Sequence, residues 1–367
     1  MSEKEKLAWL RLSRTENVGP ITFYRLVDFC GSASKALERL PDMSRRGGRT
    51  KPLNAPSIAQ IEKEYESLKK LGGDIITAGE DSYPLALAAL DDAPPVLSVL
   101  GNIAKDHNSC IAIVGARNAS LNGKKFAEKL AQELGQNNQI IVSGLARGID
   151  TAAHIGSLAT GTIAVVAGGI DIIYPEENKK LYDEIKEKGA IIAESPLGQP
   201  PIAQSFPRRN RIVSGLSKGV VVVEATMRSG SLITARLAGE QGRDVWAVPG
   251  HPFDPRATGP NHLIREGATL VRSADDILES IRSFSGLGMR EPKQPETDFH
   301  GSFSDEPDMP ENATENIMEH LSFTPIGVDE LIRSSLLSIS AVQIVLLEME
   351  LAGRIKRHPG NRVSLVS

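Results

Sequence analysis

The sequence has few of the residues on which several common kinds of site depend. Only two of its 367 residues are cysteines, and Cys30 and Cys110 lie in no metal-ligand spacing, so we expect no zinc site. Aromatic residues make up 4% of the chain, too few for a surface built from many stacking rings. The net charge of −4 shows no general excess of positive charge, so any nucleic-acid-binding surface must be local.

Long apolar segments are also missing. No apolar run reaches the roughly 18–20 residues of a membrane span. The first residues, Met-Ser-Glu-Lys-Glu-Lys, contain no apolar region of a signal peptide. We therefore predict a cytoplasmic protein with no membrane association.

Length and composition favour an ordinary globular protein of two or three domains. Hydrophobic residues make up 40% of the chain and charged residues 24%. Changes in apolar periodicity divide it into four segments, residues 1–72, 73–284, 285–313 and 314–367.

Residues 1–72 are predicted to form a helical domain. The turn Asn17–Pro20 separates two helices, and Pro20 is well placed to begin the second. This helix–Val-Gly-Pro–helix arrangement resembles a helix-hairpin-helix or SAM-like module; a small structural helical domain is the alternative. We expect residues 41–56, which are rich in arginine and glycine, to form a solvated loop.

Residues 73–284 alternate short apolar runs with amphipathic segments. Most of the runs are continuously apolar, which is typical of strands buried on both faces of a parallel sheet. Alternating strands and helices predict a Rossmann-like, doubly wound, mostly parallel α/β sheet with its ligand at the carboxyl ends of the strands. The expected strands are Val96–Leu100, Ile111–Val114, Ile140–Ser143, Thr162–Ala167, Ala190–Ala193, Val220–Glu224, Asp244–Val248 and Thr269–Val271.

Residues 285–313 read as an acidic linker that contains four prolines and lacks apolar periodicity. The last segment, 314–367, predicts three helices followed by a hairpin, which describes a winged-helix-like domain. Its third helix, Ile339–Leu351, contains Glu348 and Glu350 but no lysine or arginine. This helix therefore suits protein contact or intramolecular packing better than duplex DNA.

The segment Ile111–Gly123 predicts a strand, a turn and a helix start, an arrangement that leaves backbone N–H groups free for an anion. Gly115 ends the strand, and Arg117 stands where a dinucleotide fingerprint requires its second glycine. A guanidinium at that place supplies a forked donor for phosphate. Ser120 is predicted to cap the helix, with phosphate binding as the alternative.

The next strand leads into a turn of similar type, Ser143–His154, which contains Arg147. Asp150 and His154 lie four residues apart, and we interpret them as a pair on a helix surface rather than as acid–base catalysts.

A basic segment, Pro207–Lys218, precedes the strand Val220–Glu224 and holds four basic residues and no acidic one. We expect it to be a loop that crosses the same rim of the sheet and holds phosphate. Phe206 either stacks on a base or anchors this segment in the core.

A fourth turn, Glu224–Arg236, predicts a helix capped by Ser231 with Thr234 in its first turn. The sequence contains no G-x-S-x-G elbow, no H-E-x-x-H and no paired acidic metal site. We therefore predict a non-enzymatic protein without a metal or other cofactor.

These motifs, in this order, resemble the DprA family (also called Smf), the DNA-processing protein A of bacteria. The resemblance rests on G-A-R-N-A-S from Gly115, S-G-L-A-R-G-I-D-T-A-A-H from Ser143, F-P-R-R-N-R-I-V-S-G-L-S from Phe206 and S-G-S-L-I-T-A-R from Ser229. It covers residues 74–281 and extends to the helical N-terminal segment and the winged-helix-like tail.

The resemblance implies binding of single-stranded DNA, protection of incoming DNA in natural transformation, loading of RecA recombinase and homodimer formation. It implies that Arg117 and the basic residues of 207–218 hold backbone phosphates, with Arg208, Arg209 and Arg211 as alternatives for one such role. The predicted DNA-binding set is Gly115, Arg117, Ser120, Arg147, Phe206, Arg208, Arg209, Asn210, Arg211, Lys218, Ser231 and Thr234.

An enzymatic alternative is a nucleotide-binding or nucleoside-monophosphate-hydrolysing protein of the lysine-decarboxylase-like Rossmann group. That group carries a P-G-G-x-G-T-x-x-E motif. Here the corresponding stretch begins at Thr226 and has Thr234 and Ala235 where the glutamate is needed. The missing carboxylate disfavours this alternative.

Overall fold

The computed structural model describes residues 1–103, 109–285, 310 and 312–366. The chain divides into two compact units, which are Met1–Glu62 with Lys293–Ser367, and Lys63–Pro292. The acidic linker predicted over 285–313 lies almost entirely outside the described residues.

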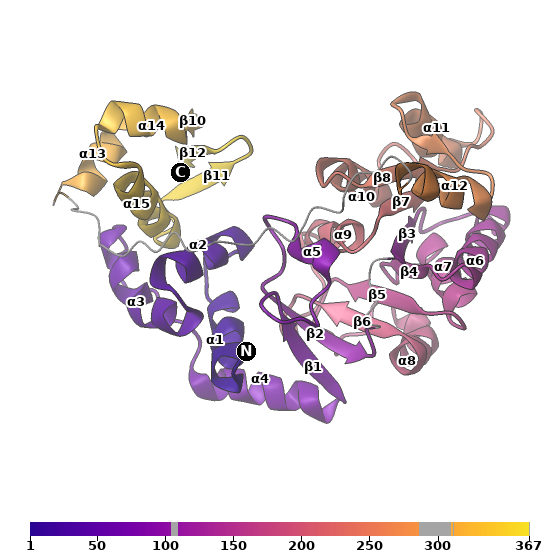
Figure 1. Ribbon diagram of the computed structural model, residues 1–367, viewed down its shortest axis with the longest axis horizontal. Coiled ribbons are helices and arrows are strands. Elements are labelled where there is room, and N and C mark those ends of the chain that lie inside the picture. Colours follow the sequence, from indigo (N-terminus) through magenta and orange to yellow (C-terminus); the bar gives the residue numbers. More distant parts are fainter. Residues whose placement is uncertain (104–108, 286–309, 311, 367) are drawn as a thin grey trace. The chain divides into compact units, whose positions relative to one another are not determined.

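The first unit combines the N-terminal helices with the C-terminal winged helix (Figure 1). Its N-terminal helices are α1 (Glu3–Ser13), α2 (Pro20–Cys30) and α3 (Ala33–Arg46), and α4 (Ile58–Lys70) leads into the second unit. Pro20 is the first residue of α2, as the sequence predicts. In the core of these helices, the ring centroids of Trp9 and the buried Phe23 lie 4.9 Å apart in an edge-to-face arrangement.

The predicted loop over residues 41–56 is wrong in its first part, because α3 continues through Pro41 to Arg46. Proline inside a helix costs about 3 kcal/mol through the lost hydrogen bond and a steric clash. The helix persists because Ala36, Leu40 and Met43 form a fully buried stripe on one face. Tertiary packing therefore outweighs the local effect of the proline.

The winged helix consists of α13 (Ala313–His320), β10 (Ile326–Gly327), α14 (Val328–Ser335), α15 (Ile339–Leu351), β11 (Ile355–His358) and β12 (Arg362–Leu365). Its three strands pair in the order β10-β12-β11.

Within the described residues, no single helix is long and apolar enough to cross a membrane. Only α14 and α15 taken together, with a bend of 118° between them, meet the length and composition required.

Helix α15 packs on the N-terminal helices as well as on its own domain. Arg46 Nε lies 2.7 Å from Glu348 Oε1, and Thr22 Oγ1 donates a hydrogen bond of 3.1 Å to Glu350 Oε1. Arg357 of β11 also pairs with Glu350, at 2.9 Å. The two carboxylates that the sequence analysis noted thus serve intramolecular packing, as predicted for this helix.

The carboxyl group of Glu348 should make the first unit sensitive to pH. Burial raises the pKa of Glu348 from 4.5 to about 7, although Arg46 opposes this shift. Stability from this group is fully present below pH 4.5 and is lost as the pH rises through about 7, because the docked helix must then hold a buried charge.

We therefore expect Glu348→Gln to raise the thermal midpoint of the first unit above pH 7 and to change it little at pH 5. Calorimetry of the full chain at both pH values measures this effect. The control is Glu315→Gln, which changes an exposed carboxylate in the first turn of α13. Equal effects of Glu348→Gln at both pH values would contradict the prediction.

The second unit is built on a nine-stranded sheet with the order β1-β2-β6-β5-β4-β3-β7-β8-β9. The strands are β1 (Gly73–Thr77), β2 (Val96–Gly101), β3 (Cys110–Val114), β4 (Ile140–Ser143), β5 (Thr162–Val166), β6 (Ala190–Ala193), β7 (Gly219–Val222), β8 (Asp244–Ala247) and β9 (Thr269–Leu270). The seven strands from β6 to β9 are parallel, whereas β1 and β2 pair antiparallel at one edge. The predicted doubly wound, mostly parallel sheet is confirmed.

Helices cover both faces of this sheet (Figure 1). One core includes residues of α5 (Leu85–Ala88), α9 (Ser205–Gly215) and α10 (Gly230–Glu240). The other includes residues of α6 (Leu121–Gln136), α7 (Ile149–Ser157) and α12 (Ala274–Ser285). Along β3, Cys110, Ala112 and Val114 enter the first core, and Ile111 and Ile113 enter the second. Burial on both faces explains why the strands are continuously apolar.

Candidate nucleic-acid interface

The order of the parallel strands reverses between β3 and β7, the point where doubly wound sheets usually bind their ligand. In this chain a carboxylate that accepts two hydrogen bonds from Ser120 occupies that point. Glu224, which follows β7, accepts hydrogen bonds from Ser120 N at 2.8 Å and Ser120 Oγ at 2.6 Å. Ser120 Oγ also accepts from Gly123 N at 2.9 Å, which confirms the predicted cap of α6.

Ser120 is therefore not placed to bind phosphate. Glu224 occupies the first turn of α6, where an anion would otherwise sit. A side chain at Gly123 would have its Cβ only 2.5 Å from the Glu224 carboxyl carbon, so the close approach requires glycine there. Gly115 serves packing too, because an added Cβ would lie 2.6 Å from Ile149.

An open pocket of about 310 Å³ lies instead at the carboxyl ends of the neighbouring strands β4 and β5. Its lining brings together residues from four segments, including Arg117, Gly144, Arg147, Tyr174, Phe206 and Arg209. Four of these residues belong to the predicted set, whereas Tyr174 was missed. Its position after a sheet strand and beside Pro175 is the signal that could have indicated it.

Arg117 and two aromatic rings form the accessible part of this pocket. The guanidinium carbon of Arg117 lies 5.1 Å from the Phe206 ring centroid, a distance that allows a cation–π contact. The rings of Phe206 and Tyr174 are 5.9 Å apart and tilted by 57°. Within the described residues, the Arg117 guanidinium has no ion pair or hydrogen bond, so its donors are available to a ligand.

Arg147 lies at the edge of the same pocket. It forms an ion pair of 3.0 Å with Glu177, and both side chains are about 60% exposed. An exposed pair of this kind contributes little to stability, at most about 1 kcal/mol. A phosphate could therefore compete for the guanidinium with little loss.

Arg209 forms the base of the pocket and is only 7% exposed. It donates to the carbonyl oxygens of Gly144 and Val165, and its Nε donates to Asn210 Oδ1. A Cβ on Gly144 would meet this guanidinium at 2.4 Å, so that glycine makes room for Arg209. Arg209 therefore holds the ends of β4 and β5 in place and has few donors left for a ligand.

The interpretation of Asp150 and His154 as a surface pair is wrong, because both side chains are buried. Asp150 accepts hydrogen bonds from the amides of Gly144 and Ala146. Burial raises the pKa of Asp150, and the charge of Arg209 opposes this shift. His154 Nδ1 lies 2.7 Å from Thr162 Oγ1. Burial, helped by Arg209, lowers the pKa of His154 to about 3, so the imidazole is neutral at physiological pH.

The predicted basic loop of residues 207–218 is mostly helix α9, and its arginines point to different surroundings. Arg208 is exposed, whereas Arg209 and Arg211 are buried. Arg211 Nη2 pairs with Glu194, and Nη1 donates to the carbonyl oxygen of Asp92 at 2.5 Å. The prediction of a phosphate contact is therefore wrong for Arg211, which joins parts of the fold.

Four further residues of the predicted set do not line the pocket. The amide of Lys218 donates to the carbonyl of Cys110, the first residue of β3, so Lys218 lies at the amino edge of the sheet. Ser229 rather than Ser231 caps α10, and Thr234 is 2% exposed. Asn210 Nδ2 lies 3.4 Å from the Gly230 carbonyl and links α9 to α10.

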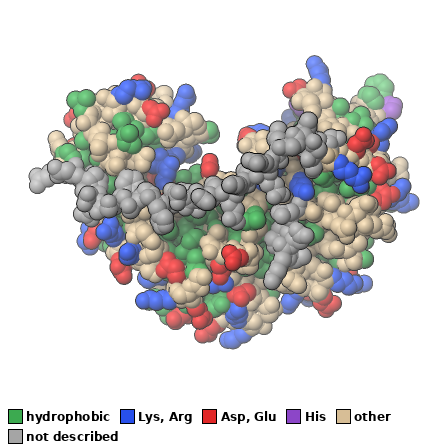
Figure 2. Space-filling view, in the orientation of Figure 1, with side chains coloured by type: hydrophobic (Ala, Val, Ile, Leu, Met, Phe, Trp, Pro, Cys, Tyr) green, Lys and Arg blue, Asp and Glu red, His purple; other side chains and the backbone are tan. Residues whose placement is uncertain are grey.

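Charges of both signs are mixed on the face drawn in Figure 2, in keeping with a local rather than general cationic surface. Among the described residues, no group of three or more His, Cys, Asp or Glu side chains could hold a metal ion. The pocket thus offers a cation and aromatic rings without an evident catalytic group.

A doubly wound, mostly parallel sheet with such a pocket at the carboxyl ends of its strands defines a Rossmann-like α/β protein. The family of the DNA recombination-mediator protein A matches residues 74–282, and the chain belongs to this family. The DprA-like N-terminal HHH domain matches residues 3–67, and the DprA winged helix domain matches residues 303–361.

Relatives of the chain carry the names of the same family. It is 40% identical over 308 residues to protein Smf of Escherichia coli, covering 83% of this chain and 81% of Smf. It is 48% identical over 222 residues to the DNA processing protein DprA of Streptococcus pneumoniae, covering 60% and 77% of the two chains.

Solved structures of the family share the fold. The crystal structure of DprA from S. pneumoniae superposes with a TM-score of 0.62 at 35% identity, covering 76% of this chain and 98% of that one. DNA processing protein A from Helicobacter pylori, whose structure concerns its single-stranded DNA binding mode, gives a TM-score of 0.53 at 30% identity, covering 58% and 96%.

Proposed function

We propose that this chain binds single-stranded DNA in the pocket formed by Arg117, Phe206 and Tyr174, and that it does so without chemical change to the DNA. The observation that carries the proposal is the Arg117 guanidinium, which has no polar partner among the described residues and lies 5.1 Å from the centre of the Phe206 ring. A cation next to a ring matches a nucleotide strand, which presents a phosphate next to a base. The single-stranded DNA binding of the H. pylori relative supports the same reading.

The proposal includes the role of a recombination mediator. In this role the chain would protect incoming DNA during transformation and help to load RecA recombinase onto it, acting as a cytoplasmic homodimer. The family description and the names of the relatives support this assignment. The enzymatic alternative receives no support from the pocket, since the nearby carboxylates of Glu224 and Asp150 are engaged in internal hydrogen bonds.

Salt titration of binding to fluorescent oligothymidylate tests the proposal. In a plot of the logarithm of the association constant against the logarithm of the salt concentration, each phosphate contact to a single strand contributes about −0.7 to the slope. If Arg117, Arg147 and Arg208 each contact one phosphate, we expect a slope of about −2. Duplex DNA of the same length should compete weakly because its bases are not free to stack in the pocket.

Two results would contradict the proposal. One is the absence of measurable binding at low salt, and the other is equal affinity for duplex and single strands. Release of free base from nucleoside monophosphates would instead support the enzymatic alternative.

A further inference from the structure

The loop that follows β8 exposes an aromatic residue that no part of the pocket described above uses. Phe253 leaves 91% of its surface accessible to solvent. The ring of His251, also exposed, lies with its centroid 5.6 Å from that of Phe253 at a tilt of 44°. Burial of a large ring contributes about 1.5–3 kcal/mol to stability, a contribution that Phe253 forgoes in this position.

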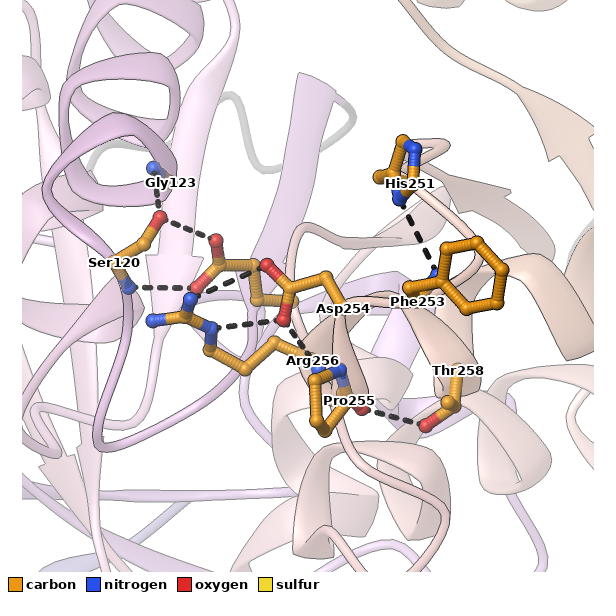
Figure 3. A network of polar contacts seen from close by, with 9 residues as sticks. Ser120, Gly123, His251, Phe253, Asp254, Pro255, Arg256 and Thr258 are labelled. Carbon is orange, nitrogen blue, oxygen red and sulfur yellow. Dashed lines mark hydrogen bonds and ion pairs between the residues drawn. The ribbon is translucent and has the colours of Figure 1, made fainter.

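The exposure does not come from a loosely held loop (Figure 3). The Asp254 carboxylate accepts from the Arg256 backbone amide at 2.9 Å and from its guanidinium at 3.1 and 3.2 Å. Gly250 and Asn261 exchange two hydrogen bonds, and the Phe253 amide lies 3.3 Å from His251 Nδ1. The backbone is thus fixed in a conformation that presents both rings.

This loop lies on the same rim of the sheet as the pocket, because β8 is parallel to β4 and β5. Three strand spacings separate β8 from β4 and four separate it from β5. At 4.7–4.9 Å per spacing, the loop lies roughly 14–19 Å along the rim from the pocket. At about 3.4 Å per stacked nucleotide, a strand held in the pocket needs about 4–6 further nucleotides to reach the loop.

The rim between the two places suits a nucleic-acid strand. Arg228, which follows β7, is exposed and has no ion pair among the described residues, so it can meet a phosphate. Met227 beside it is 53% exposed, and Leu121 at the start of α6 is 69% exposed. The Glu224 carboxylate accepts hydrogen bonds from Ser120, and Arg256 is close enough to interact with its charge.

We propose that His251 and Phe253 form a second stacking point for a base of the same single strand that the Arg117–Phe206–Tyr174 pocket binds. This inference rests on the proposed function. An isolated pair of rings beside polar groups suits one base better than a protein partner, which would require a contiguous apolar patch. The long path along the rim then sets the length of DNA that the chain prefers.

The test compares oligothymidylates of about 4 and about 16 nucleotides, lengths that bracket the usual range of site sizes. Phe253→Ala should lower the affinity for the long strand about 10-fold and leave the affinity for the short one unchanged, since one stacked base contributes about 1–3 kcal/mol. Phe253→Trp should retain the affinity. Leu336→Ala is the matched control, because Leu336 is also 91% exposed but lies in the other unit.

A single 2-aminopurine moved along the long strand gives a second readout. Its fluorescence should be quenched by stacking at one position in the unaltered protein and restored in Phe253→Ala. Unchanged long-strand affinity in Phe253→Ala would overturn the inference while leaving the proposed function intact. A change of sedimentation coefficient without a change of affinity would also overturn it, in favour of a contact between copies. Failure of the unaltered protein to bind either strand would overturn the proposed function itself.

Discussion

Replacing both Arg117 and Phe206 by alanine should weaken binding of oligothymidylate about 100-fold. A charge-assisted hydrogen bond to phosphate contributes about 1.5–3 kcal/mol, and a stacked base about 1–3 kcal/mol. The two side chains touch, at 5.1 Å from guanidinium carbon to ring centroid, so their effects should not add fully. Fluorescence anisotropy on the two single variants and the double variant measures both the loss and the coupling.

The fold should survive these changes, because Arg117 is exposed and Phe206 only half-buried. Circular dichroism and thermal unfolding of each variant check this expectation. Arg117→Lys keeps the charge but not the planar fork, so it should recover only part of the affinity.

Lys218→Ala supplies the matched control for loss of a cation. Lys218 is exposed like Arg117 but lies at the amino edge of the sheet, the length of a strand away from the pocket. We expect its replacement to leave the affinity and the salt slope nearly unchanged. A loss as large as that of Arg117→Ala would place the DNA on another surface and contradict the assignment of the pocket.

Lys218 and Arg117 lie at opposite ends of the sheet strands, and the sequence predicts part of the arrangement that separates them. Strands buried on both faces are continuously apolar, so β3 to β7 could be predicted from the apolar pattern of the sequence. The first strand, β1, was missed because its run Gly-Asp-Ile-Ile-Thr is not continuously apolar and alternates buried with half-buried residues. Parallel order then places Arg117, Arg147 and the end of β5 on one rim before any coordinates are known.

Partners far apart in the sequence could not be predicted in this way. The Glu224 carboxylate meets Ser120 across 104 residues and converts an expected anion site into an internal cap. In α9 the stripe of Ile212, Val213 and Leu216 fixes the buried face, and Arg209 falls at its start. Arg208 and Arg209 have identical side chains but lie on different faces of α9, so one is exposed and the other buried. The sequence of this segment is too polar to show which face is buried.

Arg209→Met is expected to lower the free energy of unfolding of the second unit by about 3–5 kcal/mol, the usual cost of removing one partner from a buried charged pair. Arg209 is buried, and its positive charge is the largest influence that lowers the pKa of Asp150 against the effect of desolvation. Its removal also leaves the carbonyl oxygens of Gly144 and Val165 without this donor. Urea unfolding followed by circular dichroism measures the loss.

Arg208→Ala is the neighbouring control, and its exposed side chain should change stability by no more than about 0.5 kcal/mol. Adding Asp150→Asn to Arg209→Met should restore part of the stability, because a buried neutral amide does not depend on the Arg209 charge that opposes the desolvation of the carboxyl. The recovery stays incomplete because the carbonyl oxygens of Gly144 and Val165 still lack the Arg209 donor. A cost below about 1 kcal/mol for Arg209→Met would mean that Arg209 does not hold the strand ends, and its guanidinium would then be free for DNA.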